Sequence, residues 1–163
     1  MSATARRAAI LSLGFSFIAT LATGASAGSF VNWETPQVSP IALTPSGATL
    51  LAVNTADNRL EVFSVRGGSV THVRSIPVGL DPVSVRARTE NEAWVVNHVS
   101  DSLSIVDLPS GRVVRTITVG DEPADVVFAG SPSRAFVTLS QLNRVLVLDP
   151  QNPTAAGTPI AIQ

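Results

Sequence analysis

The chain has 163 residues, a formal net charge of −1 at pH 7 and no cysteine. Its length suits one domain, and the lack of cysteine excludes disulfides, thiolate metal sites and c-type haem attachment within this chain. Because the charge is nearly neutral and the arginines are scattered rather than clustered, nucleic acid is not expected as a partner.

The N-terminus has the three parts of a secretory signal peptide. Arg6 and Arg7 form a basic start, the run from Ala8 to Ala22 is nearly all apolar or small, and Ala25 to Ala27 supplies a small-x-small cleavage site. The apolar run is shorter than the roughly 20 residues that a membrane span needs. We therefore expect residues 1–27 to be removed, leaving no membrane span and a chain exported to the periplasm or the extracellular space. The alternative is an uncleaved N-terminal anchor.

A fourteen-residue pattern recurs along the rest of the chain. It reads W-V-V-N-H-V-S-D-S-L-S-I-V-D at Trp94–Asp107 and F-V-T-L-S-Q-L-N-R-V-L-V-L-D at Phe136–Asp149, and a blurred copy covers Leu51–Ser64. Each copy is typical of two short strands with a polar turn between them. A period of about 42 residues with strands inside each repeat indicates the blades of a β-propeller, because one blade cannot bury both its faces alone.

This period predicts an all-β chain that holds about three blades of four antiparallel strands each. Residues 28–35 form a lone strand or linker, followed by blade 1 at 36–79, blade 2 at 80–120 and blade 3 at 121–163. Glycine and proline mark the tight turns between strands. The predicted strands are 41–43, 49–53, 59–65 and 70–76 in blade 1; 83–87, 93–96, 103–106 and 113–119 in blade 2; and 124–128, 135–139, 145–148 and 158–162 in blade 3.

Three blades do not close a ring, since propellers typically have about four to eight. An open arc leaves apolar faces and unpaired strand edges exposed. We therefore expect the chain to be an N-terminal fragment, an open arc of a seven-bladed propeller, with the remaining blades of the parent protein as its partners. The alternative is a ring closed by two three-blade arcs.

The run V-V-N-x₃-D-S-L-S-I-V-D-L-P-S-G-R-V-V-R-T-I-T-V-G-D-E-P, from Val95 to Pro123, resembles the YVTN-type β-propeller repeat. The consensus of that WD40-like family runs YVTN…SNTVSVIDL…TGKVVATIPVGxxP. Trp94 and Phe136 stand in its tyrosine position, Val96 replaces its threonine, and Leu139 replaces its asparagine in blade 3. The resemblance covers about 36–163 and implies a propeller fold, but it is a poor guide to activity because unrelated functions share such scaffolds.

Three functions are compatible with this resemblance. The first is an exported binding or interaction scaffold, with an unknown protein or small ligand as its partner. The second is the propeller half of a periplasmic redox protein, as in relatives that resemble quinoprotein amine dehydrogenase heavy chains or haem d1-type propellers. No cofactor is expected in this chain; a haem or quinone domain would lie downstream, where a C-x-x-C-H motif would reveal it. The third is a lactonase-like hydrolase, which needs acids and a histidine converging on the channel. For this chain alone, we expect no catalytic activity.

Polar residues mark one face of the predicted propeller. The loop between the second and third strands of a blade and the loop that leads to the next blade open on the same face, where ligands commonly bind. His98 is the most versatile side chain there, because imidazole can act as a base or a metal ligand. Asp and Asn are also the residues that tight turns prefer for structural reasons. The candidate ligand-binding residues are Asn54, Asp57, Asp81, Asn97, His98, Asp101, Asp121 and Asp125, with Asn58, Glu122 and Asn143 beside them.

Other notable residues have structural interpretations. Asp125 begins an innermost strand and can point into the central channel, where bonds to neighbouring blade amides are the simplest role. Asp107 and its counterpart Asp149 are expected to cap turns, and His72 is expected on the surface of an outer strand. Trp94 and the phenylalanines Phe128 and Phe136 are expected to pack between blades. Neither histidine has a partner at metal-site spacing, so no metal and no catalytic residue is assigned.

Overall fold

The computed structural model describes residues 35–154 and 157–162. The predicted signal peptide, 1–27, and most of the predicted linker, 28–34, lie outside the described residues. Within the described ranges the chain forms twelve strands and no helix. Accordingly, none of these residues belongs to a helix with the length and apolarity that crossing a membrane requires.

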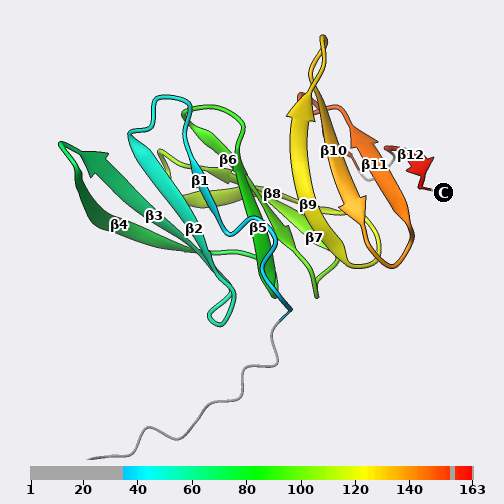
Figure 1. Ribbon diagram of the computed structural model, residues 1–163, viewed down its shortest axis with the longest axis horizontal. Coiled ribbons are helices and arrows are strands. Elements are labelled where there is room, and N and C mark those ends of the chain that lie inside the picture. The colour runs from blue at the N-terminus through cyan, green and yellow to red at the C-terminus, as the bar shows by residue number, and fades with distance from the viewer. Residues whose placement is uncertain (1–34, 155–156, 163) are drawn as a thin grey trace, which may run out of the picture. The chain divides into compact units, whose positions relative to one another are not determined.

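The strands form three four-stranded antiparallel sheets, which we call blades 1, 2 and 3 (Figure 1). Within each blade the strands follow one another in chain order. Blade 1 contains β1 (Ile41–Leu43), β2 (Thr49–Asn54), β3 (Arg59–Arg66) and β4 (Ser69–Pro77). Blade 2 contains β5 (Pro82–Ala87), β6 (Glu92–Asn97), β7 (Ser102–Asp107) and β8 (Arg112–Thr118). Blade 3 contains β9 (Pro123–Ala129), β10 (Arg134–Leu139), β11 (Arg144–Leu148) and β12 (Thr158–Ala161).

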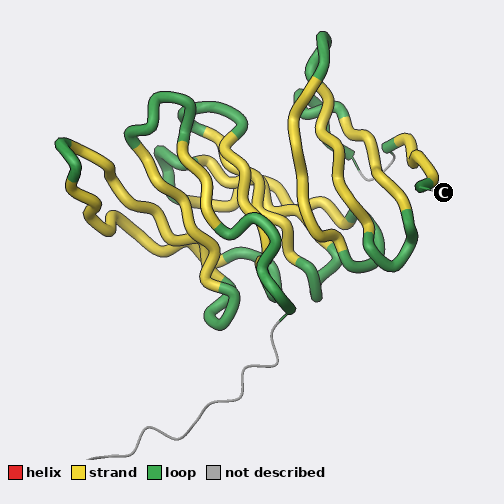
Figure 2. Tube along the Cα trace, in the orientation of Figure 1, coloured by secondary structure: helices red, strands yellow, loops and turns green. Residues whose placement is uncertain are grey.

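This architecture confirms the predicted all-β fold of three propeller blades. Each predicted strand is present, and its ends differ only slightly from the prediction. Short turns separate consecutive strands in blades 1 and 2 and from β9 to β11 in blade 3 (Figure 2). The predicted turn caps are also present: the Asp107 carboxylate accepts a hydrogen bond from the Ser110 N–H at 2.8 Å, and the Asp149 carboxylate accepts one from the Gln151 N–H at 3.0 Å.

Two hydrophobic clusters hold neighbouring blades together, and each lies at one seam. The first seam, between blades 1 and 2, is aliphatic, with Leu51 at its centre and Ala87 packed against the cluster. The second seam, between blades 2 and 3, contains Trp94, which is fully buried. Its indole ring meets Phe128 edge-on, with ring centroids 5.2 Å apart. The predicted packing of aromatic residues between blades therefore holds for this pair, whereas Phe136 is only half-buried.

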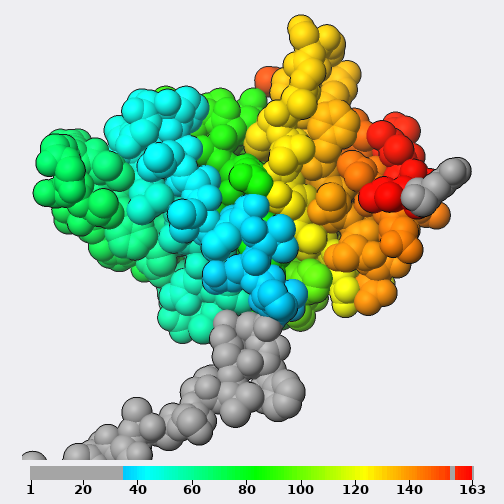
Figure 3. All heavy atoms as spheres, in the orientation of Figure 1, coloured from blue at the N-terminus to red at the C-terminus, as the bar shows by residue number. Residues whose placement is uncertain are grey.

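The chain just before β1 reaches across to the next blade. The N–H of Val38 donates to the Val83 carbonyl at 3.0 Å, and the N–H of Val85 donates to the Ser39 carbonyl at 2.9 Å. In Figure 3 this segment, coloured blue, lies against the green and yellow atoms of the next two blades. Backbone bonding thus joins the segment before β1 to β5, the inner strand of blade 2.

One polar residue of blade 2, Ser84 of β5, is fully buried. Its hydroxyl donates to the Ala124 carbonyl at 2.7 Å and accepts from the Ser39 N–H at 3.1 Å. Because both hydrogen-bonding roles are used, burying this hydroxyl carries little penalty.

Candidate functional site

One face of the blades is built from turns that share a single geometry. We call this the loop face; it consists of the turns at 55–58, 98–101 and 140–143 and the linkers at 78–81 and 119–122. Asn58, Asp101 and Asn143 occupy equivalent turn positions and have φ of 56°, 51° and 48°. This left-handed conformation is uncommon except for Gly, Asn and Asp, which explains the residue choice.

Two of these turn residues, Asn58 and Asp101, accept hydrogen bonds from the linker that leaves their blade. The carbonyl of Asn58 accepts the Val78 N–H at 3.0 Å, and its side-chain oxygen accepts the Asp81 N–H at 2.7 Å. In blade 2 the Asp101 carboxylate likewise accepts the Glu122 N–H at 3.0 Å. The linkers in turn accept bonds from the next blade: the N–H of His98 donates to the Asp81 carbonyl at 2.9 Å. The rim backbone is therefore fixed by repeated bonds.

Two candidates of the rim are exposed, one in the turn of blade 1 and one on the second linker. Asp57 is exposed and bonds to Asn54, whose amide Nδ2 donates to the carboxylate at 3.0 Å. Asp121 is exposed on the second linker, next to Glu122. These carboxylates face solvent, so they can meet a ligand without losing a buried partner.

His98 lies beside the second linker rather than at the tip of its turn. Its Nδ1 is 3.1 Å from the Pro123 carbonyl, and its Nε2 is 3.9 Å from the Glu122 carboxylate. The imidazole side chain is only 14% exposed. This residue therefore connects blades 2 and 3 and has one carboxylate within electrostatic reach.

Two candidates do not reach the surface of the rim. Asn97 is fully buried, and its Nδ2 donates to the hydroxyls of Ser102 and Ser104 at 3.2 and 2.9 Å. Gly79 explains the depth of this amide: a Cβ at position 79 would come within 2.6 Å of Asn97 Cγ. Asp81 is 9% exposed because the first linker folds it beneath the turn. Neither side chain can meet a ligand at the rim as placed.

Asp125 lies near the start of the inner strand β9 and forms an ion pair that sequence reasoning missed. Arg86 of β5 approaches the Asp125 carboxylate through Nη2 at 2.6 Å, and the same nitrogen donates to the Ser39 hydroxyl at 2.7 Å. The Ser39 hydroxyl also donates to Asp125 at 3.2 Å. The bonds of Asp125 between blades are thus to side chains, not to the backbone amides expected from the sequence.

Apolar side chains protrude from the loop face among these polar groups. Leu80 of the first linker is 53% exposed, Val99 at the tip of the blade 2 turn is 60% exposed and Leu142 of the blade 3 turn is 41% exposed. The Leu80 N–H donates to the Ser100 hydroxyl at 3.0 Å. The first linker therefore lies next to the turn that carries Val99. The loop face therefore presents both apolar groups and carboxylates to solvent.

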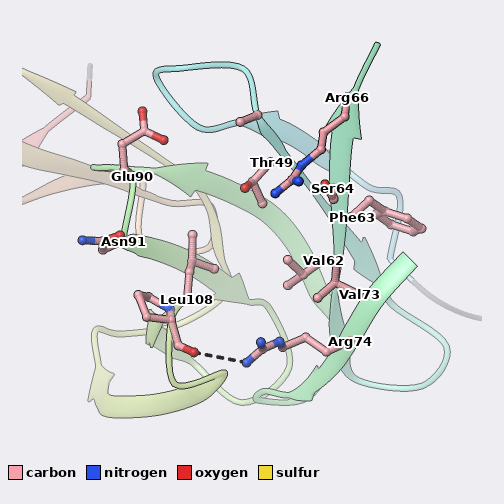
Figure 4. A pocket seen from close by; sticks show the side chains of 12 residues that line it. Thr49, Val62, Phe63, Ser64, Arg66, Val73, Arg74, Glu90, Asn91 and Leu108 are labelled. Carbon is pink, nitrogen blue, oxygen red and sulfur yellow. Dashed lines mark hydrogen bonds between the residues drawn. The ribbon is translucent and has the colours of Figure 1, made fainter. Parts of the chain in front are cut away.

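A groove of about 300 Å³ follows the first seam on the outer part of the blades (Figure 4). Its floor is apolar, with Val62, Val73 and Leu108. Arg66 and Arg74 reach in from blade 1, as Figure 4 shows. The remaining lining residues are Ala48, Thr49, Phe63, Ser64, Glu90, Asn91 and Pro109.

Two hydrogen-bonded bridges border this groove. Arg74 Nη1 donates to the Pro109 carbonyl of blade 2 at 3.3 Å. Glu90 of blade 2 accepts bonds from the Ser46 N–H at 2.5 Å and from the Ser46 hydroxyl at 2.8 Å. The hydrogen bond from the Ser46 hydroxyl, aided by the backbone bond, lowers the pKa of Glu90 below its ordinary value, so this carboxylate is charged at neutral pH.

The second seam carries an equivalent groove of about 390 Å³. Strand register makes Ile105 and Arg115 the counterparts of Val62 and Arg74, and Arg115 Nη1 donates to the Pro153 carbonyl at 3.0 Å. The same register places Glu92 where blade 1 has Thr49. The other residues that line this groove are Arg88, Val114, Pro150, Gln151 and Pro153.

Glu92 pairs with one of the two arginines that line the second groove. Its carboxylate accepts both Nε and Nη2 of Arg88, at 2.5 and 2.7 Å, and also the Trp94 indole N–H at 2.7 Å. Burial would raise the pKa of Glu92, but the bonds from Arg88 and Trp94 outweigh burial and lower the pKa below its ordinary value. In the first groove, by contrast, no described carboxylate pairs with Arg66 or Arg74.

His72 is exposed on β4, as expected, and its Nε2 is 2.8 Å from the Glu61 carboxylate. Burial would raise the pKa of Glu61, but hydrogen bonds from Ser75 and His72 lower it. Within the described ranges, no three histidine or acidic side chains lie close enough together to hold a metal ion.

Comparison with known proteins supports the fold. No protein-family model matches the chain. No curated protein matches it either. Solved structures do: hydrazine synthase from Kuenenia stuttgartiensis is 25% identical with a TM-score of 0.64, and the match covers 78% of this chain and 37% of that one. A 6-phosphogluconolactonase-like protein from Bacteroides uniformis is 20% identical with a TM-score of 0.62, covering 76% of this chain and 43% of that one.

The dihydro-haem d1 dehydrogenase NirN also matches, at 18% identity and a TM-score of 0.60, covering 76% of this chain and 28% of that one. These neighbours are β-propeller-like proteins, and the shared fold is that of a propeller. The chain spans less than half the length of each of these three structures.

Proposed function

We propose that the chain is an exported β-propeller repeat protein of the YVTN type whose loop face binds a partner, either a protein or a small ligand. The observation that carries this proposal is the combination of a fixed backbone with exposed apolar groups. The bonds of Asn58 and Asp101 hold the turns rigid, and Val99 and Leu142 protrude from them. A rigid surface loses little entropy on binding.

The proposal includes membership of a longer protein, with further blades that complete the ring. It also includes export, which rests on the residues of the segment 1–27. The lactonase-like and haem-linked functions are alternatives that the fold permits, since the solved neighbours include both kinds of protein. At 20% and 18% identity those two matches support the fold alone.

The test is site-specific photo-crosslinking in the native host. A photoreactive residue replaces Val99 on the loop face, and the control replaces Ser110, which is exposed in the turn at the other end of blade 2. We expect one discrete adduct from position 99 and none from position 110. Equal adducts from both positions, or none from position 99, would contradict the proposal.

Export is tested separately by cell fractionation and N-terminal sequencing. The expected result is a mature protein that begins at Gly28 and is released with the exported fraction. A full-length protein in the cytoplasm would contradict export without affecting the loop-face proposal.

A further inference from the structure

We propose that the groove at the first seam binds an organic monoanion, a carboxylate with a short apolar body. This site is distinct from the loop face, because the groove lies between β3, β4 and the turns at the other end of blade 2. The argument rests on its charge, its floor, its size and the contrast with the second seam.

Charge comes from two guanidinium groups that meet no carboxylate among the described residues. Arg66 ends β3 and makes no hydrogen bond to another described side chain, and in Figure 4 its guanidinium points back into the groove towards Thr49. Arg74 donates through Nη1 to the Pro109 carbonyl, and its other N–H groups remain available to a ligand. Guanidinium groups bind carboxylates through two parallel hydrogen bonds, so a carboxylate suits these arginines.

Glycine at position 111 is needed for Arg74 to lie where it does. Gly111 has φ +67°, and a Cβ there would come within 2.9 Å of Arg74 Cδ and closer still to its Nη1. Gly111 therefore leaves space for the guanidinium across the turn of blade 2. This close approach sets the position of one of the two charges.

The floor and the far wall limit the rest of the ligand. Val62, Val73 and Leu108 supply an apolar floor, which favours a hydrocarbon body. The charged Glu90 on the far wall repels a second negative charge, which favours a monoanion. The volume of about 300 Å³ is at the small end of ligand sites. Together these features fit a short-chain carboxylate.

The groove at the second seam differs from the first in how its arginines are paired. It is larger and equally lined by two arginines, but Glu92 already occupies Arg88 with two hydrogen bonds. A ligand carboxylate would have to displace this internal one. The same scaffold therefore has one groove whose two guanidinium groups pair with no described carboxylate and one in which Arg88 already pairs with Glu92.

The experiment titrates the full chain with hexanoate and follows amide and methyl signals by NMR. We expect saturable shifts at Val62, Val73 and Leu108, with a Kd in about the low-millimolar range for so small a ligand. Hexan-1-ol, which has the same chain length and no charge, is expected to bind at least about tenfold more weakly because it lacks the charge-assisted bonds. Inorganic phosphate tests whether the apolar body matters.

Variants complete the test. Arg66→Gln is expected to weaken hexanoate binding by at least about tenfold, whereas Arg144→Gln, which removes an exposed arginine at the start of β11, leaves it unchanged. The amide spectrum of each variant shows whether it is folded. The proposal is overturned if hexanoate causes no saturable shift, if hexan-1-ol or phosphate binds equally well, or if Arg66→Gln binds as the parent does. None of these outcomes depends on a partner at the loop face.

Discussion

The two seams between blades are built on one frame and differ in what fills it. At equivalent positions the first seam has Leu51 and Ala87, and the second has Trp94 and Phe128. Outside this core, Thr49 lines the first groove and Glu92 the second. The comparison teaches that the repeat determines the strands. Single departures from it decide which seam contains an aromatic pair and which groove has arginines that no carboxylate pairs with.

The largest expected effect comes from the aromatic pair of the second seam. Trp94→Ala removes a fully buried indole and should lower the free energy of unfolding by about 3–5 kcal/mol. Leu51→Ala at the equivalent position of the first seam should cost less, towards the low end of the range of about 2–5 kcal/mol, because a smaller side chain is lost. Urea denaturation followed by circular dichroism measures both. A greater loss for Leu51→Ala would reverse the proposed ranking of the seams.

The inner-strand ion pair comes next. Asp125→Ala leaves Arg86 without its carboxylate at a partly buried site, which should cost about 1–2 kcal/mol. The control is Asp121→Ala on the exposed linker, expected to change stability by less than about 0.5 kcal/mol. Equal effects of the two variants would show that the pair adds nothing to the second seam.

The lowered pKa of Glu92 predicts that the stability of the fold depends on pH in the acidic range. The folded pKa of Glu92 is lowered, so its carboxylate contributes stability above the unfolded pKa of about 4.3, and this contribution is lost as pH falls through the folded value. Glu92→Gln should cost about 1 kcal/mol at pH 7 and should flatten the stability profile below pH 4.3. Denaturation midpoints measured from pH 3 to 7 test this, and an unchanged slope would contradict it.

Two glycine-to-alanine variants distinguish the cost of backbone strain from the effect of displacing Arg74. Gly47 and Gly111 both have positive φ, +74° and +67°, so alanine should cost about 1 kcal/mol at either position. A Cβ at position 47 meets nothing within 4 Å, whereas one at position 111 meets Arg74. Only Gly111→Ala should therefore weaken hexanoate binding, by a few-fold on the scale of one hydrogen bond. Equal affinities of the two variants would count against the role of Arg74.

The sequence predicted the blades well because turn residues and alternating apolar residues are local signals. Asn58 and Asp101 were recognised as residues that turns prefer, and their bonds to the linkers follow from that preference. The pairing of Arg86 with Asp125 was not predictable in the same way. It joins two blades, and nothing in either strand specifies which side chain of the next blade lies opposite.

How deeply a polar side chain is buried was equally hard to predict from the sequence. Asn97 directly precedes the turn at 98–101, yet it is fully buried, because Gly79 has no Cβ that would clash with its amide. The charged groove needed knowledge of two elements at once, since Arg66 and Arg74 come from β3 and β4 and are completed by a turn of blade 2. Sequence periodicity describes each blade singly, and these features arise where two blades meet.

An exchange between the seams tests the central claim most directly. Thr49→Glu places a carboxylate beside Arg66, and Glu92→Thr removes the one that holds Arg88. In the double variant, hexanoate should no longer shift the methyl signals of Val62 and Leu108 and should instead shift those of Ile105 and Val114. Binding that stays at the first seam would show that single departures from the repeat do not decide where the anion binds.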